Sequence, residues 1–150
     1  MNILFTKRKS VRSFKPNPVE KEKLDEILAA ANSAPSAGGL RARKIVAVED
    51  KKMRANISEA AFGQTSIAEA PLVLAFVALP KVSAKKYDER GKNLYAVQDA
   101  TLAASFAWLQ AVDLELSSVW VGGFEEEKVR KVLDLGENER PIALLPIGYA

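Results

Sequence analysis

The order of elements along this 150-residue sequence predicts an α+β or α/β domain with three layers. Two observations carry the prediction. Apolar runs of strand length alternate with stretches of helical spacing, and 48% of the residues are hydrophobic while only 27% are charged. A chain of this length removes roughly 68–70% of its unfolded surface from water. We therefore expect residues 1–150 to form a single domain that needs no disulfide or metal to hold it together.

The first predicted element is a helix over 18–32. Asn17 can cap it, Pro18 suits the first helical position, and Glu20 can complete a capping box. Apolar residues then follow at helical spacing, which predicts one buried face. The helix is expected to end in a loop of small residues over 32–39.

Two strands and a second helix are predicted next. Residues 45–48 are an apolar run between charged neighbours, which predicts a short buried strand. Residues 51–61 are predicted to form a helix. The run 71–80 begins and ends with proline and is apolar in between. Because such a run is too apolar for a half-exposed strand, we expect it at the centre of the sheet.

The second half of the chain predicts a polar surface excursion over 81–92, a long helix over 94–112, a strand over 117–121, a helix over 125–134 and a strand over 142–147. The long helix has few polar residues, so it must be covered on several sides. Either the core of one monomer or a second subunit can supply that cover. Three glutamates in the first turn of the following helix complement the positive end of its dipole.

The sequence contains neither cysteine nor histidine. This excludes a disulfide framework, a zinc finger, a cysteine nucleophile, a Ser-His-Asp triad and an imidazole proton shuttle, and we expect no metal site. Chemistry must then come from lysine, tyrosine, serine or carboxylate side chains, or from a bound cofactor that the protein holds and tunes. We favour the bound cofactor.

Basic residues gather in two short clusters, although the formal net charge is only +3. Residues 1–19 hold five lysines and arginines and no acid, and three more basic residues lie in 41–44. A nucleic-acid-binding module is one alternative, but aromatic residues are not interleaved with these clusters into a stacking platform. No run reaches the roughly 18 apolar residues of a membrane span, and the N-terminal residues lack the apolar core of a signal peptide. We expect a cytoplasmic protein without a membrane partner.

The first candidate binding element is the segment 8–12. Arg8, Ser10 and Arg12 are two residues apart, so their side chains point to one side if the segment is extended. Two guanidinium groups that flank a hydroxyl suit a phosphate, because their forked charged donors match its oxygens. The plain alternative is a solvated basic arm.

The second candidate is the loop that follows the first predicted helix, which contains Pro35, Ser36, Ala37, Gly38 and Gly39. Small side chains let backbone amides approach a flat ligand closely. An ordinary loop at the end of a helix has the same composition, so this feature alone does not decide between the two.

Two further candidates precede and follow the long helix. The side-chain amide of Gln64 offers a donor and an acceptor together, which suits a flavin pyrimidine ring or a base. Most such glutamines are surface residues. Val121, Gly122 and Gly123 lead from a predicted strand toward a helix start, a place where free amides meet ligands in open sheets. There is no dinucleotide-binding fingerprint and no Walker loop.

In their joint order, these motifs resemble the nitroreductase family of FMN-dependent oxidoreductases, and the resemblance covers nearly the whole chain. The motifs that carry it are RKSVRSF at 8–14, APSAG at 34–38, AFGQ at 61–64, APLVL at 70–74, DA at 99–100, VGGF at 121–124 and LPIGY at 145–149. The resemblance implies one FMN-binding domain with an α+β fold, in which helices flank a mainly antiparallel sheet. It also implies an intertwined homodimer with FMN at the subunit interface.

The resemblance assigns a role to each candidate. The arginines and the serine of 8–12, with Lys9 nearby, would bind the phosphate and ribityl end of FMN. Residues 35–39 of the other subunit would line the flavin ring, and Gln64 would meet its pyrimidine edge. Residues 121–123 would present backbone amides near the reactive nitrogen of the ring. No side chain acts as a catalytic acid or base in this assignment, because the flavin carries the chemistry.

The implied activity is hydride transfer from NAD(P)H through the flavin to a quinone, a nitroaromatic compound or a similar small acceptor. Two alternatives stay open: a flavin-dependent dehydrogenase or oxidase of a small or peptide substrate, and a non-catalytic flavin-binding protein. Residues 38–41, 67–71 and 87–91 are similar to the branch whose oxidases dehydrogenate azoline rings in modified peptides. Residues 40–43 depart from the Gln-Pro-Trp of many members, and many members also have a C-terminal arm that supplies another basic residue to the phosphate.

Overall fold

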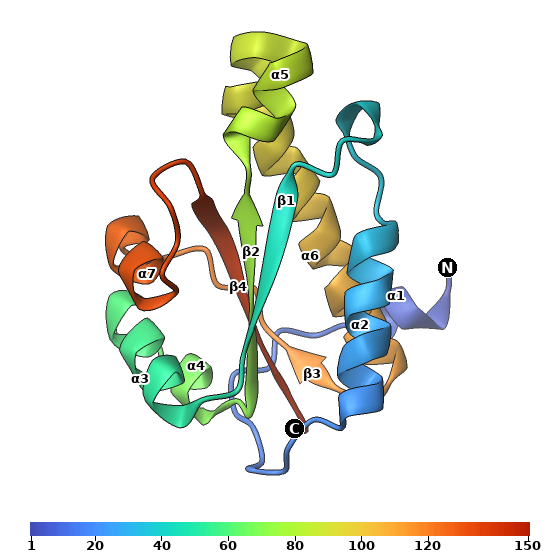
Figure 1. The fold of residues 1–150 in the computed structure, drawn as a ribbon. Coiled ribbons are helices and arrows are strands. Elements are labelled where there is room, and N and C mark those ends of the chain that lie inside the picture. The colour runs from blue at the N-terminus through green and yellow to red at the C-terminus, as the bar shows by residue number, and fades with distance from the viewer.

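The computed structural model describes all 150 residues and shows a central sheet with helices on both faces (Figure 1). The strands lie in the spatial order β1 (Arg43–Val48), β2 (Leu72–Ala78), β4 (Arg140–Gly148) and β3 (Ser117–Ser118). Every neighbouring pair is antiparallel. The prediction of three layers is confirmed. Because all the strand pairs are antiparallel, the fold belongs to the α+β class rather than the α/β class.

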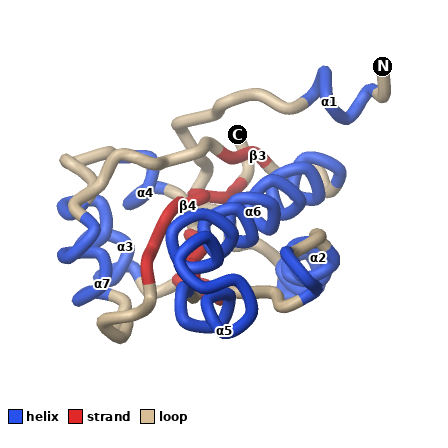
Figure 2. The backbone as a smooth tube through the Cα atoms, turned by 90° about the horizontal axis from the view of Figure 1, so that it is seen from above, coloured by secondary structure: helices blue, strands red, loops and turns tan.

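The helices form two groups. The longer pair, α2 (Lys21–Ser33) and α6 (Ala96–Asp113), covers one face of the sheet, and Figure 2 shows both on the same side of the strands. The other face is covered by α3 (Lys51–Ala60), α4 (Thr65–Glu69) and α7 (Glu126–Val132). The remaining helices are α1 (Ile3–Lys7) and α5 (Pro80–Arg90). None of the helices combines the length and apolar character that a transmembrane span requires.

The central strand β2 divides the interior into two cores. Leu72, Leu74 and Phe76 belong to the core beside α2 and α6, whereas Val73 and Ala75 belong to the core beside α3, α4 and α7. This division follows from the two-residue period of a strand. All seven residues of β2 are buried, so the prediction of a strand at the sheet centre is confirmed.

Alanines bring α6 close to the sheet. Six of its seven buried residues are alanine, namely Ala96, Ala100, Ala103, Ala104, Ala107 and Ala111. Since the distance between packed elements depends on the side chains at the contact, a row of methyl groups permits close approach. The outer side of the helix leaves Leu102 and Phe106 partly exposed, at 37% and 38%.

The predicted start of the first long helix is wrong. The helix begins at Lys21 rather than at 18, and Glu20 takes the N-cap position without a side-chain capping bond. Val19 is drawn into the core, which keeps the chain extended up to that point. The Glu20 carboxylate accepts a hydrogen bond from the Tyr149 hydroxyl instead of completing a capping box.

Three other predicted elements also differ from the structure. The polar stretch 81–92 is no irregular excursion, because Pro80 opens α5 and a π turn, Gly91–Tyr95, continues into α6. The predicted strand 117–121 shortens to β3 and one isolated bridge between Val121 and Leu144. The strand predicted as buried at 45–48 is β1, which lies at the edge of the sheet and leaves part of its surface exposed.

Candidate functional site

The segment 8–12 runs along the short edge strand β3. Ser10 forms a parallel bridge with Ser118, and the Val11 amide donates to the Ser118 carbonyl oxygen at 3.0 Å. Ser118 is buried, and its hydroxyl donates to the Pro146 carbonyl oxygen at 2.7 Å. The bridge therefore ties this segment to the edge of the sheet.

The cationic side chains of this segment have no carboxylate partner within the chain. The Arg8 guanidinium lies 4.6 Å from the centre of the Trp108 ring on α6, which is a cation–π distance. Lys9, Ser10 and Arg12 are exposed, and none of them forms a salt bridge or a side-chain hydrogen bond. The donors of a stacked guanidinium lie in its plane and stay available. The segment thus presents positive charge that the protein itself does not neutralise.

Two exposed glycines between β3 and α7 have unpaired backbone amides. The amides of Gly122 and Gly123 donate no hydrogen bond within the chain. The preceding residue is firmly held, because the amide and carbonyl of Val121 each bond to Leu144 at 2.9 Å. A Cβ built at Gly123 would meet nothing within 4 Å. Unpaired N–H groups at such a place need a partner from solvent or from a ligand.

Gln64 is joined directly to this pair of glycines. Its Nε2 donates to the Gly123 carbonyl oxygen at 2.9 Å and to the Ala61 carbonyl oxygen at 3.0 Å. The Ser58 hydroxyl donates to the Gln64 carbonyl oxygen at 2.8 Å and fixes its backbone. Since both side-chain bonds use Nε2, only Oε1 remains free. The sequence suggested an amide with a free donor and acceptor, but the donor is already engaged.

Three of the four candidate motifs lie along the β3 side of the sheet. Ser118, which contacts the segment 8–12, pairs with Ile147, and Ile147 pairs with Leu72 at the start of β2. Gln64 precedes α4, which leads into the same end of β2. The contact between Gln64 and Gly123 adds the glycine pair to this group.

The loop of small residues, Pro35–Gly39, lies at the opposite end of the sheet. It leads into Arg43, which pairs with Ala78 at the far end of β2. Figure 1 shows the turn Ala37–Gly39 near the top beside α5, with α4 at the bottom. The seven residues of β2 span about 20 Å. Within one chain, therefore, this loop does not join the other three motifs.

A buried carboxylate that composition and spacing did not single out anchors this loop. Asp99 on α6 accepts from the Ala37 amide with Oδ1 and from the Ala42 amide with Oδ2, both at 3.0 Å. The sequence shows Asp99 only as part of the family pattern. Its target Ala37 is 62 residues away, and such a distant pairing leaves no periodic signal in the sequence.

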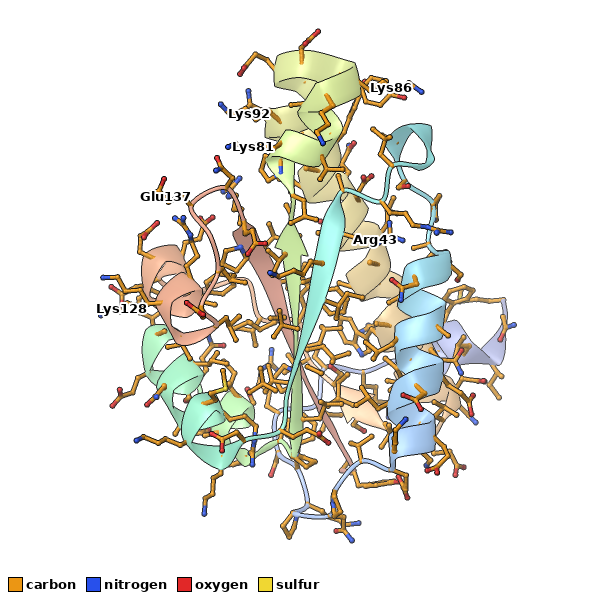
Figure 3. The ribbon with its side chains drawn as sticks, in the orientation of Figure 1. Arg43, Lys81, Lys86, Lys92, Lys128 and Glu137 are labelled. Carbon is orange, nitrogen blue, oxygen red and sulfur yellow. The ribbon has the colours of Figure 1, made fainter.

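Arg43 braces the other side of the same loop. Its Nη2 donates to the carbonyl oxygens of Ala31, Asn32 and Ala34 at the end of α2, over 3.0–3.2 Å (Figure 3). Burial lowers the pKa of the Arg43 guanidinium, and the Asp99 carboxylate acts in the opposite direction. Because the ordinary pKa of arginine lies far above neutrality, the group stays charged.

The main clefts of the single chain lie away from the candidate residues. One of about 440 Å³ lies between α1 and the end of α6 and is lined in part by Lys7, Lys23 and Asp113. None of the five main clefts is lined by the segment 8–12, by Gln64 or by the glycine pair. A ligand on these residues would therefore rest on an open surface of one chain.

Comparison with known proteins finds one family along nearly the whole chain. A model described as the nitroreductase family matches residues 5–86 and 64–149. An NADH dehydrogenase of Thermus thermophilus is 35% identical over 170 residues, which cover 95% of this chain and 83% of the relative. An FMN reductase (NAD(P)H) of Bacillus subtilis is 31% identical over 158 residues, which cover 97% of this chain and 64% of the relative.

Solved structures show the same likeness. An FMN-dependent nitroreductase from Clostridium difficile matches this structure with a TM-score of 0.87 at 32% identity. The match covers 100% of this chain and 87% of that one.

Proposed function

The chain belongs to the nitroreductase family, and on this premise we propose that it is an FMN-dependent enzyme that oxidises NAD(P)H and reduces a quinone, a nitroaromatic compound or a similar acceptor. Two relatives support the cofactor by their names, an FMN reductase (NAD(P)H) and an FMN-dependent nitroreductase. One observation in this structure carries the proposal: the free amides of Gly122 and Gly123 lie beside Gln64, on the β3 side of the sheet that also holds the segment 8–12.

The residues on this side of the sheet fit FMN. Arg8 and Arg12, with Ser10 between them and Lys9 beside them, would bind the phosphate, since forked charged donors match its oxygens. The absence of internal carboxylate partners leaves these donors free for it. The bound flavin supplies the chemistry by accepting a hydride from NAD(P)H and passing it to the acceptor.

The glycine pair and Gln64 would orient the ring. The amides of Gly122 and Gly123 would donate to the ring where negative charge gathers during reduction, so no side-chain acid is required. Oε1 of Gln64 would accept from the pyrimidine edge, while Nε2 holds the Gly123 carbonyl and fixes the direction of that segment. Val121, bonded twice to Leu144, secures the segment on the sheet.

We also propose that two copies of the chain form a homodimer, with FMN between them and Pro35–Gly39 of the partner subunit over the flavin ring. The open surface at the candidate residues and the distant place of this loop in one chain support it. Exposed apolar side chains on α1 and α6 supply a contact surface, namely Ile3, Phe5, Leu102 and Phe106. Apolar groups gathered in this way are typical of an interface.

The function is tested by incubation of the protein with FMN, removal of the excess, and anaerobic addition of NADH or NADPH. We expect a yellow protein that bleaches with either nucleotide or both, recovers its colour with menadione, and consumes the nucleotide steadily while menadione lasts. A protein that stays colourless after incubation with FMN would contradict the proposal. A yellow protein that consumes no nucleotide would favour the non-catalytic alternative, and bleaching by an organic or peptide substrate alone would favour the dehydrogenase alternative.

A further inference from the structure

Asp99 is a buried carboxylate for which the proposed chemistry has no direct use. It is 1% exposed, and each of its oxygens accepts one backbone amide, from Ala37 and from Ala42. Burial of a carboxylate is unfavourable unless hydrogen bonds compensate it. Here the two bonds reach both ends of one loop, so Asp99 fixes that loop relative to α6.

The loop has a conformation that needs such external support. Gly38, Gly39 and Arg41 all have positive φ, at 58°, 67° and 48°. A non-glycine residue such as Arg41 is strained in this region. Within the loop, the Ser36 hydroxyl oxygen accepts from the Arg41 amide at 2.9 Å. This is the only hydrogen bond in which a side chain of the loop binds another residue of the loop.

The support comes from two opposite charges on different elements. Arg43 holds the end of α2 through three carbonyl oxygens, and Asp99 holds the loop from α6. The Asp99 carboxylate also favours the charged form of the Arg43 guanidinium and raises its pKa against the effect of burial. On the same helix, Leu102 and Phe106 form the exposed apolar surface that we assign to the subunit contact. Asp99 therefore couples the position of the loop to the helix at the proposed interface.

We infer that Asp99 is a positioning residue that places Pro35–Gly39 over the flavin of the partner subunit. This inference rests on the proposed function. Asp99 touches no cofactor itself, and its effect is exerted on the neighbouring site rather than on the site formed by its own segment 8–12. Loss of either amide bond would release one end of the loop, lower the affinity of the partner's site for FMN and open the ring to solvent. The phosphate contacts would stay intact.

The first test is Asp99→Asn with Asp113→Asn as the matched control. The asparagine keeps the size but turns an amide group toward a backbone N–H, so one of the two bonds is lost. We expect the Kd for FMN to rise about tenfold, with a change in the fluorescence of the bound flavin. Asp113 is an exposed acid on the same helix, and its variant should bind FMN like the parent protein. An unchanged Kd in Asp99→Asn would overturn the inference.

The second test shows which subunit the loop serves. Asp99→Asn chains are combined with Arg12→Ala chains, and mixed dimers are isolated with two different affinity tags. In a mixed dimer, one FMN site would carry both defects and the other site neither. We expect one site per mixed dimer with the parent Kd, a class of site that neither variant homodimer contains. If the loop served its own subunit, each site would carry one defect and no parent-like site would form, which overturns the inference.

A variant that does not fold and a parent protein that binds no FMN are distinguished as follows. If Asp99→Asn does not fold, Asp99→Glu keeps the charge and displaces the loop by one methylene, and the same pattern in mixed dimers is expected with a smaller change in Kd. Thermal unfolding of each variant separates a general loss of stability from a specific loss of FMN. If the parent protein binds no FMN at all, the proposed function fails, and that failure is visible before any mixed dimer is made.

Discussion

Arg8 and Arg12 flank the same hydroxyl but are held differently. Arg8 lies 4.6 Å from the ring centre of Trp108, whereas Arg12 is exposed and has no partner. A stacked guanidinium is already partly ordered, so it loses less side-chain freedom when it binds a phosphate. Arg12 has no such contact, so only the ligand itself would order its side chain. Its contribution to the affinity for FMN should therefore come from its bond to the ligand alone.

Replacement of Arg12 by alanine is expected to weaken FMN binding by about 1.5–3 kcal/mol, or roughly 10- to 150-fold in Kd, because a charged hydrogen bond to phosphate is lost. Lys15→Ala removes an exposed cation from the same stretch of chain and should leave Kd nearly unchanged. Titration of each variant with FMN, followed by flavin fluorescence, measures both values. Equal affinities for the two variants would mean that Arg12 is only a solvated surface charge.

At this scale, the sequence points to residues whose proposed roles depend on local spacing. The alternation of Arg8 and Arg12 and the glycine pair can be read directly, because an extended segment and a strand end need only neighbouring residues. The roles of Asp99 and Trp108 cannot, since each acts on a segment that is distant in the chain. The contact between Gln64 and Gly123 is equally a product of the fold, because the two residues are 59 positions apart in the sequence.

Among the elements, predictions succeed where an apolar pattern fits only one position in the fold. The unbroken apolar run of β2 can only lie at the sheet centre, and the structure places it there. The helix start at 18 and the excursion over 81–92 are wrong, because polar residues fit either a loop or an exposed helix. The burial of Val19 keeps the chain extended before the helix that was predicted to start at 18. Pro80 opens a helix in the stretch that was predicted to be an excursion.

The edge strand β1 is fastened to the turn before β4 by one ion pair. Lys44 Nζ lies 2.8 Å from Glu139 Oε2, and the Gly136 amide donates to the same carboxylate at 3.0 Å. The hydrogen bond from Lys44, more than any other contact, lowers the pKa of Glu139. The carboxylate is thus more acidic in the folded chain than in the unfolded chain.

A lowered pKa stabilises the fold above the ordinary value of 4.5, and this contribution is lost as the pH falls through the folded value. We expect Glu139→Gln to lower the free energy of unfolding at neutral pH by at most about 1 kcal/mol, since the pair is partly exposed. The difference from the parent protein should shrink at a second pH well below 4.5, as the carboxylate becomes protonated.

Urea unfolding of both proteins at the two pH values measures this difference. Glu137→Gln, at an exposed acid that forms no salt bridge, serves as the control and should match the parent at either pH. A difference between Glu139→Gln and the parent that does not change with pH would show that the carboxylate charge contributes nothing.

Considered as a whole, the molecule leaves its large apolar side chains exposed at two places. Ile3, Phe5, Leu102 and Phe106 lie on α1 and α6, which contact each other. Phe62 lies two residues before Gln64, at the proposed flavin site. A second copy of the chain that covers α6 would account for the first group, and a flat ligand under the partner's loop would account for the second.

Phe106→Asp is expected to separate the subunits, because a carboxylate buried in an apolar contact has no partner there. The separated chains should also lose FMN, since the loop that covers the ring then has no neighbour to serve. Ala55→Asp adds the same charge to an exposed position of α3, on the opposite face of the sheet, and should leave both the dimer and the bound flavin unchanged.

We propose that two copies of this chain hold FMN between them. Native mass spectrometry of the protein, saturated with FMN and freed of excess, is the decisive experiment. We predict the mass of two chains with two FMN molecules for the parent protein and for Ala55→Asp, and single chains without FMN for Phe106→Asp. Single parent chains that retain FMN, or parent dimers that carry none, would contradict the claim.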